Sequence, residues 1–176
     1  KDQALAALGM WELQRGNEKA ALGWFDRFER ETLGSHLYGK ILLAKGHLLE
    51  KRGQYTEARK SLEALLGNQS SGGKEKAEAL YLMGELYLKE GNPKLAVPYF
   101  QRIYVMHGRW RDWVARAYLA SGKAFEKLND DLSARRTYQE LTEKEDFADF
   151  KETTAAKERL KALGGPLPKE EEPARG

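Results

Sequence analysis

Apolar residues recur along this chain at spacings of three and four, which is the pattern of amphipathic helices. Residues 74–90 show the pattern most clearly, with one apolar stripe formed by Ala77, Leu80, Tyr81, Gly84, Tyr87 and Leu88. A second helix is predicted over 93–105. It follows Gly91-Asn92-Pro93, whose residues suit a helix end, an N-cap and a first helical turn in that order. No segment shows sustained strand-type alternation, so the sequence predicts an all-α protein.

This helix pair repeats along the chain. Glycines recur at intervals of 37, 38 and 38 residues, at Gly9, Gly46, Gly84 and Gly122. An alanine stands 12 residues after each glycine, and a large apolar or aromatic residue stands 4 residues later, at Phe25, Leu62, Phe100 and Tyr138. Small residues allow two antiparallel helices to approach closely where they cross. The sequence therefore predicts helix pairs over about 2–32, 36–67, 74–108 and 110–144.

The turns inside the pairs are expected at Gly16-Asn17, Gly53-Gln54, Gly91-Asn92 and Asn129-Asp130. Between the second and third pairs, residues 67–73 (GNQSSGG) form the connection that is predicted to be most flexible. This connection is too short to link two domains. We therefore expect a single array over 1–163.

A ninth, unpaired helix is predicted over 148–163. Phe150, Ala156, Leu160 and Leu163 lie on one side of it, and the other side carries Lys151, Glu152, Lys157, Glu158 and Lys161. A helix with one apolar and one charged face suits the end of a repeat array, where it caps the last pair. Residues 164–176, rich in Pro, Glu and Lys, are predicted to form a disordered tail.

Composition narrows the classes of function. The sequence has no stretch of about 18 consecutive apolar residues, so we expect no membrane insertion by these residues. The net charge of +3 is small and its signs are interleaved, which gives no basis for nucleic-acid binding. Cysteine is absent, which excludes disulfides and thiolate metal sites. The chain begins at Lys1 without a visible signal peptide, so we expect a piece of a longer protein or a mature chain.

The glycine and alanine positions resemble those of the tetratricopeptide repeat (TPR) family. The third pair, ALYLMGELYLKEGNPKLAVPYFQRI, matches the family pattern through Gly84, Tyr87, Gly91, Ala96 and Phe100. The resemblance implies a right-handed α-solenoid of about four TPR helix pairs plus a C-terminal capping helix. The repeats exceed the usual ~34 residues. In this they are similar to TPR regions of bacterial cell-envelope proteins, those of the Tol-Pal coordination and outer-membrane assembly type, which favours the periplasm or cell envelope and leaves the cytoplasm open.

The resemblance also implies a groove, lined by the first helix of each pair, that binds an extended peptide. The residues expected to face it are Lys40, Leu43, His47 and Glu50, then Glu78, Tyr81, Glu85 and Lys89, then Arg116, Leu119, Lys123 and Lys127. Their mixed charges favour a ligand of mixed charge. Met10 and His47 replace the asparagines with which chaperone-binding members hold a C-terminal carboxylate, so that clamp is not expected. The alternative interpretation, a merely solvated face, stays open.

A second candidate site is the aromatic and cationic run over 104–113. Its members Arg109, Trp110, Arg111 and Trp113 have the composition of binding hot spots and would suit a partner side chain or a cell-wall glycan. The favoured alternative is structural: the two tryptophans, three residues apart at the start of a helix, fill the space between repeats.

Catalysis is not predicted. His36, His47 and His107 lie in different repeats without ligand-type spacing, and no catalytic or phosphate-binding motif is present. We therefore expect no catalytic residue, cofactor or metal. The predicted function is a non-catalytic scaffold that binds a protein or peptide partner, with a bacterial cell-envelope assembly as its expected setting. The alternative is a regulatory or spacer TPR domain of a larger enzyme or sensor. The sequence leaves the partner and the oligomeric state open.

Overall fold

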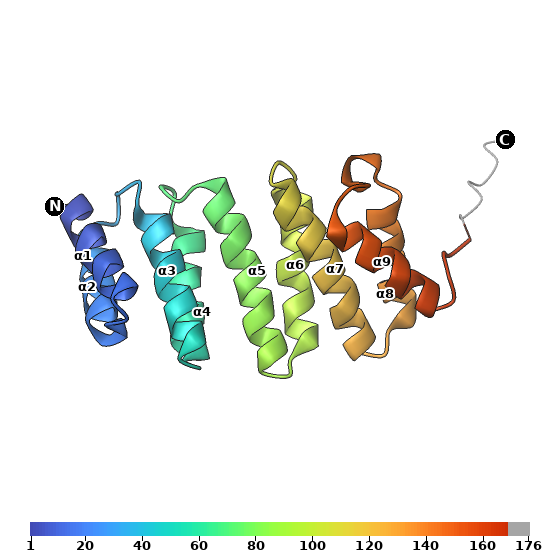
Figure 1. Cartoon of the computed structure of the whole chain (residues 1–176), viewed down its shortest axis with the longest axis horizontal. Coiled ribbons are helices and arrows are strands. Elements are labelled where there is room, and N and C mark those ends of the chain that lie inside the picture. The colour runs from blue at the N-terminus through green and yellow to red at the C-terminus, as the bar shows by residue number, and fades with distance from the viewer. Residues whose placement is uncertain (169–176) are drawn as a thin grey trace.

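The structure of the protein is a computed structural model that describes residues 1–168. Within this range the chain forms nine α-helices, one short 3-10 helix and no strand. The helices are α1 (Asp2–Gln14), α2 (Glu18–Glu31), α3 (Tyr38–Lys51), α4 (Tyr55–Gly67), α5 (Gly73–Lys89), α6 (Pro93–Met106), α7 (Arg111–Lys127), α8 (Asp131–Thr142), η1 (Glu145–Phe147) and α9 (Lys151–Ala162). They form a single row that runs from α1 at one end to α9 at the other (Figure 1).

The row is built from helix pairs. α1 packs on α2, α3 on α4, α5 on α6 and α7 on α8, and α9 packs on both helices of the last pair. We call the contact between two successive pairs a joint. This arrangement confirms the predicted all-α solenoid of four helix pairs with a C-terminal capping helix.

Each pair turns at a residue in the left-handed backbone region. Gly91 has a φ of 75°, and Asn129 takes the same role with a φ of 56°. Asn tolerates this region better than most residues, so the glycine-to-asparagine exchange in the fourth pair keeps the turn. Asn92 is the N-cap residue of α6, as expected, but its side chain makes no capping hydrogen bond, whereas the Asp130 carboxylate at the start of α8 accepts one of 3.0 Å from the Ser133 N–H.

The repeated glycines lie where the two helices of each pair cross. A Cβ placed on Gly84 would lie 2.5 Å from the Phe100 ring, and one on Gly46 would lie 2.9 Å from Leu62. Gly122 stands in the same relation to Tyr138. The large partner is completely buried in each case. The spacing of small and large residues in the sequence is therefore the packing contact that closes each pair.

The connection between the second and third pairs is packed against its neighbours. The Asn68 amide donates a hydrogen bond of 2.8 Å to the Leu33 carbonyl, and its side-chain oxygen accepts one of 2.8 Å from the Ser70 N–H. Ser71 is buried, and its side chain faces Gly39 at the start of α3. The segment predicted to be most flexible is thus anchored to the preceding pair.

The capping helix begins at Lys151, three residues later than predicted, because η1 occupies the preceding turn. Ala156 and Leu160 are buried as expected from the apolar stripe. Glu152 was predicted on the charged outer face, and this is wrong: only 8% of it is exposed. The first turn of α9 lies against α7, where the Arg116 guanidinium stands 3.9 Å from the Glu152 carboxylate and compensates its charge.

The chain beyond α9 returns to α8. The Arg135 guanidinium donates a hydrogen bond of 2.9 Å to the Gly165 carbonyl, and the Leu167 N–H donates one of 2.8 Å to the Gln139 side chain. Residues 164–168 of the predicted tail are therefore bound to the array. The remainder of that tail, 169–176, lies outside the described residues.

Candidate functional site

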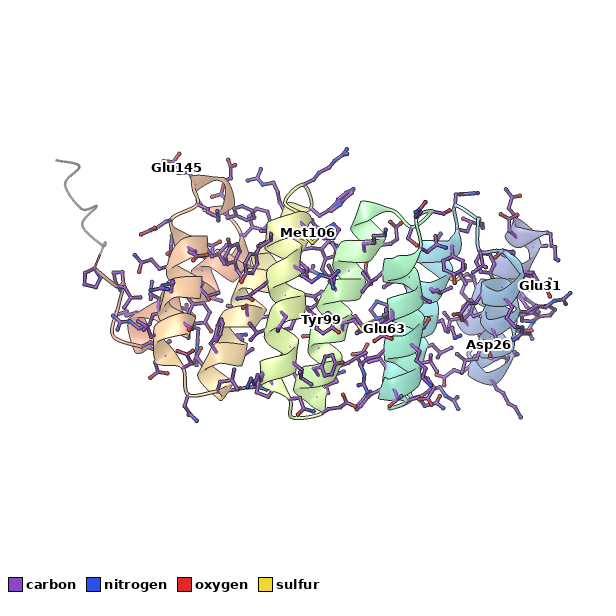
Figure 2. The ribbon with its side chains drawn as sticks, turned by 180° about the vertical axis from the view of Figure 1, so that it is seen from behind. Asp26, Glu31, Glu63, Tyr99, Met106 and Glu145 are labelled. Carbon is purple, nitrogen blue, oxygen red and sulfur yellow. The ribbon has the colours of Figure 1, made fainter. Side chains whose placement is uncertain are left out.

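The first helices of successive pairs lie side by side. α3 contacts α5, α5 contacts α7, and α7 contacts α9. Figure 1 is seen from this side, whereas the view from behind in Figure 2 shows the second helices, marked by Glu63 of α4 and Tyr99 of α6. We call the surface of α3, α5, α7 and α9 the first-helix face. All twelve residues expected to face the groove lie on its helices α3, α5 and α7.

At the joint between α3 and α5, predicted groove residues bind one another. The His47 Nε2 atom lies 3.1 Å from a Glu78 carboxylate oxygen, and the Lys89 ammonium lies 2.7 Å from Glu50. Because opposite charges meet across the joint, these four side chains hold the second pair against the third. Lys40 lies apart from them, exposed in the first turn of α3.

The electrostatics of His47 follow from these neighbours. The hydrogen bond to Glu78 raises the pKa of the His47 imidazole, and the nearby Glu50 acts in the same direction. Partial burial opposes this shift but does not cancel it. Protonation of His47 therefore strengthens the contact between α3 and α5.

At the joint between α5 and α7 the first-helix face is hollowed. The hollow has a volume of about 210 Å³ and is lined by Tyr81, Glu85, Leu88, Arg116, Leu119, Ala120, Lys123, Lys127 and Glu152. Six of the twelve residues expected to face the groove thus converge on one place: Tyr81, Glu85, Arg116, Leu119, Lys123 and Lys127. We call this the α5–α7 hollow.

Tyr81 lines the α5–α7 hollow and packs against two other aromatic rings behind it. The ring of Tyr81 lies 5.5 Å from that of Trp113 and 5.4 Å from that of Phe100, measured between centroids. Burial raises the pKa of Tyr81 to about 12, and the charge of Glu85 adds to the shift. The Tyr81 hydroxyl therefore stays neutral at physiological pH and remains a hydrogen-bond donor.

The cations of the hollow fall into two kinds. The Arg116 guanidinium lies over the Trp113 ring, 4.8 Å from its centroid, and faces Glu152 at 3.9 Å. Lys123 and Lys127 are exposed, one helical turn apart, and within residues 1–168 neither makes an ion pair. Arg116 is thus held in place by the protein, whereas the two lysines are available to a ligand.

Within residues 1–168 the other joints, unlike the joint between α5 and α7, are bridged by ion pairs. Lys51 lies 2.7 Å from Glu18 across the first joint, Lys89 lies 2.7 Å from Glu50 across the second, and Arg159 of α9 pairs with Glu126. Burial alone would raise the pKa of Glu126, but the hydrogen bonds from Arg159 and Tyr138 lower it. Across the described part of the chain, the joint between α5 and α7 is the one that no ion pair bridges.

The second candidate site does not form one surface. Trp110 lies against the start of α5, where a Cβ on Gly73 would be 3.0 Å from its ring nitrogen, and Arg109 lies over its ring at 5.5 Å. Arg111 turns toward Phe147, 5.3 Å from the ring centroid. Trp113 packs against Tyr81 and lies beneath the Arg116 guanidinium. The two tryptophans therefore pack at the joint between the third and fourth pairs.

Sequence reasoning missed three residues of the hollow: Leu88, Ala120 and Glu152. Glu152 was assigned to the solvent side of α9, and Leu88 to the apolar stripe of α5. The position of Leu88 could have been found, because it lies one turn from Glu85 and two turns from Tyr81 on the same face of the helix. Glu152 carries no such signal, since α9 lies outside the register of the repeats.

Over residues 1–168 the structure has neither a candidate metal site nor a membrane-spanning helix. No group of three or more His, Asp or Glu side chains is placed so that it could hold a metal ion. None of the helices in this range combines the length and apolar character needed to cross a lipid bilayer.

Comparisons with known proteins agree with this architecture. A family model described as tetratricopeptide repeat matches residues 43–110, and another with the same description matches 116–145. A tetratricopeptide repeat protein from Parabacteroides merdae ATCC 43184 superposes with a TM-score of 0.72 at 14% identity, over 92% of this chain and 59% of that one. The chain thus spans about three fifths of that relative. No curated protein matches in sequence.

Two further solved structures are similar over nearly the same range. A MamA protein gives a TM-score of 0.65 at 17% identity and covers 92% of this chain and 83% of that one. MamA from Desulfovibrio magneticus RS-1 gives 0.62 at 19% identity and covers 92% of both chains. At these identities the likeness concerns the fold.

Proposed function

The chain belongs to the tetratricopeptide repeat family, and from this premise we propose that it is a protein–protein interaction scaffold that binds an extended segment of a partner on its first-helix face. The family matches support the general role, because stacked helical repeats build extended binding surfaces. The observation that carries the finer proposal is the α5–α7 hollow, where a cavity, the partly exposed ring of Tyr81 and two lysines with no ion-pair partner among residues 1–168 coincide.

The chemistry of the hollow fits a segment with both apolar and acidic side chains. An apolar side chain would lie against Tyr81, Leu88 and Leu119, which remain partly exposed. An acidic side chain beside it would meet the ammonium groups of Lys123 and Lys127. The apolar contact would supply most of the affinity, since exposed charges mainly alter the association rate and its salt dependence.

The joint between α3 and α5 has a supporting role in this proposal. Its pairs His47–Glu78 and Glu50–Lys89 are already bound within the protein. A ligand that replaced them would lose as many ion pairs as it formed. We therefore assign these four side chains to fixing the angle between the second and third pairs.

The bacterial cell envelope is the setting that we propose for this binding, because the repeats are longer than the ~34 residues usual in the family. Fractionation of the source cells, followed by immunodetection of the protein, tests the setting. Recovery of the protein with cytoplasmic markers alone would contradict it.

A charge-reversal experiment tests the binding site. The test variant is Lys123→Glu with Lys127→Glu. The matched control is Lys60→Glu with Lys94→Glu, which makes the same charge change at exposed lysines of α4 and α6 on the opposite side. Each form is immobilised, and proteins from an extract of the source cells are captured, identified and purified for titration at several salt concentrations.

We expect a partner that binds the parent and the control with equal affinity. Its dissociation constant for the test variant should be roughly tenfold higher, with a flatter salt dependence, because two favourable charge interactions become repulsive. Circular dichroism should show the same helicity in all three proteins. A partner that binds the test variant and the control equally well would refute binding at the α5–α7 hollow.

A further inference from the structure

One face of α1 is apolar and exposed to solvent, with the Arg15 guanidinium lying over its Trp11 ring, 4.4 Å from the centroid. It is formed by Ala4, Ala7, Leu8 and Trp11, whose spacing places them on one stripe of the helix. All four residues are exposed, with 39% of Leu8 and 47% of Trp11 accessible to solvent. α1 stands at one end of the row in Figure 1, and we call this stripe the outer face of α1.

The same register in the other first helices is covered. Counted from the repeated glycines, the equivalent positions are Ile41, Ala44, Lys45 and Leu48 in α3, Ala79, Leu82, Met83 and Leu86 in α5, and Ala117, Ala120, Ser121 and Ala124 in α7. Those in α5 and α7 are all buried, as are Ile41 and Leu48 in α3. The second helix of the preceding pair covers them, since α2 packs on α3, α4 on α5 and α6 on α7. The outer face of α1 is thus a surface on which a helix packs.

The two ends of the array differ in the polarity of their exposed side chains. At the far end, α9 exposes Lys157, Glu158 and Lys161 to solvent. Head-to-tail stacking of two molecules would bury these charges against Leu8 and Trp11, which is unfavourable. The outer face of α1 carries no charged residue among its four positions, so a second outer face of α1 is a better match for it than the α9 end.

The stripe is complementary to itself. If two copies of α1 pack antiparallel about a twofold axis between Ala7 and Leu8, the large Trp11 of each copy lies opposite the small Ala4 of the other. Large residues facing small ones allow close helix packing. A twofold contact of this kind also closes on itself and does not propagate into a filament.

We propose that the outer face of α1 pairs with the same face of a second copy of this chain, as an antiparallel helix pair. One pair of helices buries less area than a standard interface, so the dimer is weak. A dissociation constant on the order of 10–100 µM is expected. The first-helix face is formed by α3, α5, α7 and α9 and does not include the outer face of α1, so we expect it to stay accessible in the dimer.

Sedimentation equilibrium of the parent and of Leu8→Lys tests the pairing. Lysine stands at the equivalent position of α3, as Lys45, and Leu8 is exposed, so the fold accommodates the change. The matched control is Leu95→Lys, at another exposed leucine, which lies in α6 and is 52% accessible. We expect the parent and the control to form dimers as concentration rises, and Leu8→Lys to weaken dimerisation at least tenfold.

Single cysteines locate the contact, because the chain contains none of its own. Ala7→Cys should form a disulfide-linked dimer under mild oxidation with copper phenanthroline in air, whereas Lys157→Cys on the far end should not. A parent that stays monomeric up to about 0.5 mM overturns the proposal and assigns the outer face of α1 to a helix of another protein or of a longer form of this chain. A dimer that Leu8→Lys leaves unchanged, or equal cross-linking of both cysteines, also overturns it.

Discussion

Replacing Gly84 by alanine is the sharpest test of how the helix pairs are closed. The added Cβ would lie 2.5, 2.6 and 2.9 Å from three ring atoms of Phe100, whereas ordinary contacts are at least 3.4 Å. The ring would have to withdraw by about 1 Å in a close-packed interior. Phe100 is completely buried and packs against the Tyr81 ring at 5.4 Å, so it has little space for this movement.

Two opposing effects determine how much Gly84→Ala changes the free energy of unfolding. Alanine is more favourable than glycine inside a helix by about 0.5–1 kcal/mol. Overpacking a tight contact costs about 1–3 kcal/mol. The second effect should prevail, so we expect Gly84→Ala to lower the free energy of unfolding by roughly 0.5–2 kcal/mol. Urea denaturation followed by circular dichroism at 222 nm measures this change.

Gly23→Ala is the matched control. Gly23 also lies inside a helix, but no atom stands within 4 Å of its added Cβ. This variant should gain about 0.5–1 kcal/mol from helix propensity alone. Combining Gly84→Ala with Phe100→Leu should cost less than the sum of the two changes, because leucine already faces the glycine in the second pair, at Leu62. If Gly84→Ala is stabilised as much as Gly23→Ala, the crossing contact does not limit the packing and the reasoning is refuted.

Two further predictions concern a joint and a turn. Because Glu78 raises the pKa of His47 in the folded state, the stabilising contribution of this contact is fully present below the unfolded pKa of about 6.5 and is lost as pH rises through the folded value. In urea denaturation the parent should therefore have a higher free energy of unfolding than His47→Gln at pH 6, and this difference should shrink toward pH 8. The decrease should be less than about 1 kcal/mol, because the imidazole is half exposed. A difference that grows with pH would contradict the pairing. Gly91→Ala should cost about 1 kcal/mol, because its φ of 75° is strained for alanine, whereas Asn129→Gly should be neutral or slightly stabilising in the same thermal or urea unfolding assay. Equal stability of parent and Gly91→Ala would show that the turn relaxes.

The candidate site could be predicted only in part. Tyr81, Glu85, Arg116, Lys123 and Lys127 follow from the position of each residue relative to its repeat's glycine, because that position fixes which side of the first helix a residue occupies. The sequence did not show that they gather in one hollow. That depends on the angle between the third and fourth pairs, which many packing contacts at the joint set together.

The ion pairs between α3 and α5 could also be predicted only in part. His47 and Glu78 are 31 residues apart, and Glu50 and Lys89 are 39 apart. Their helices were predicted, and so was the face on which each lies, but the choice of partner was not. Long side chains can reach several neighbours across a joint, and only the spatial offset between two helices decides which oppositely charged group is nearest.

The sequence by itself determined the repeating unit. Gly84, Phe100 and Gly91 mark a crossing, its large partner and a turn, and these features recur at a fixed period because each helix pair is closed by contacts within about 40 residues of sequence. The tertiary structure alone decided the burial of Glu152, the lack of an ion-pair partner for Lys123 and Lys127 within the described residues 1–168, and the exposure of the outer face of α1. These properties depend on what packs beside each pair, and the residues of the pair itself do not encode their neighbours.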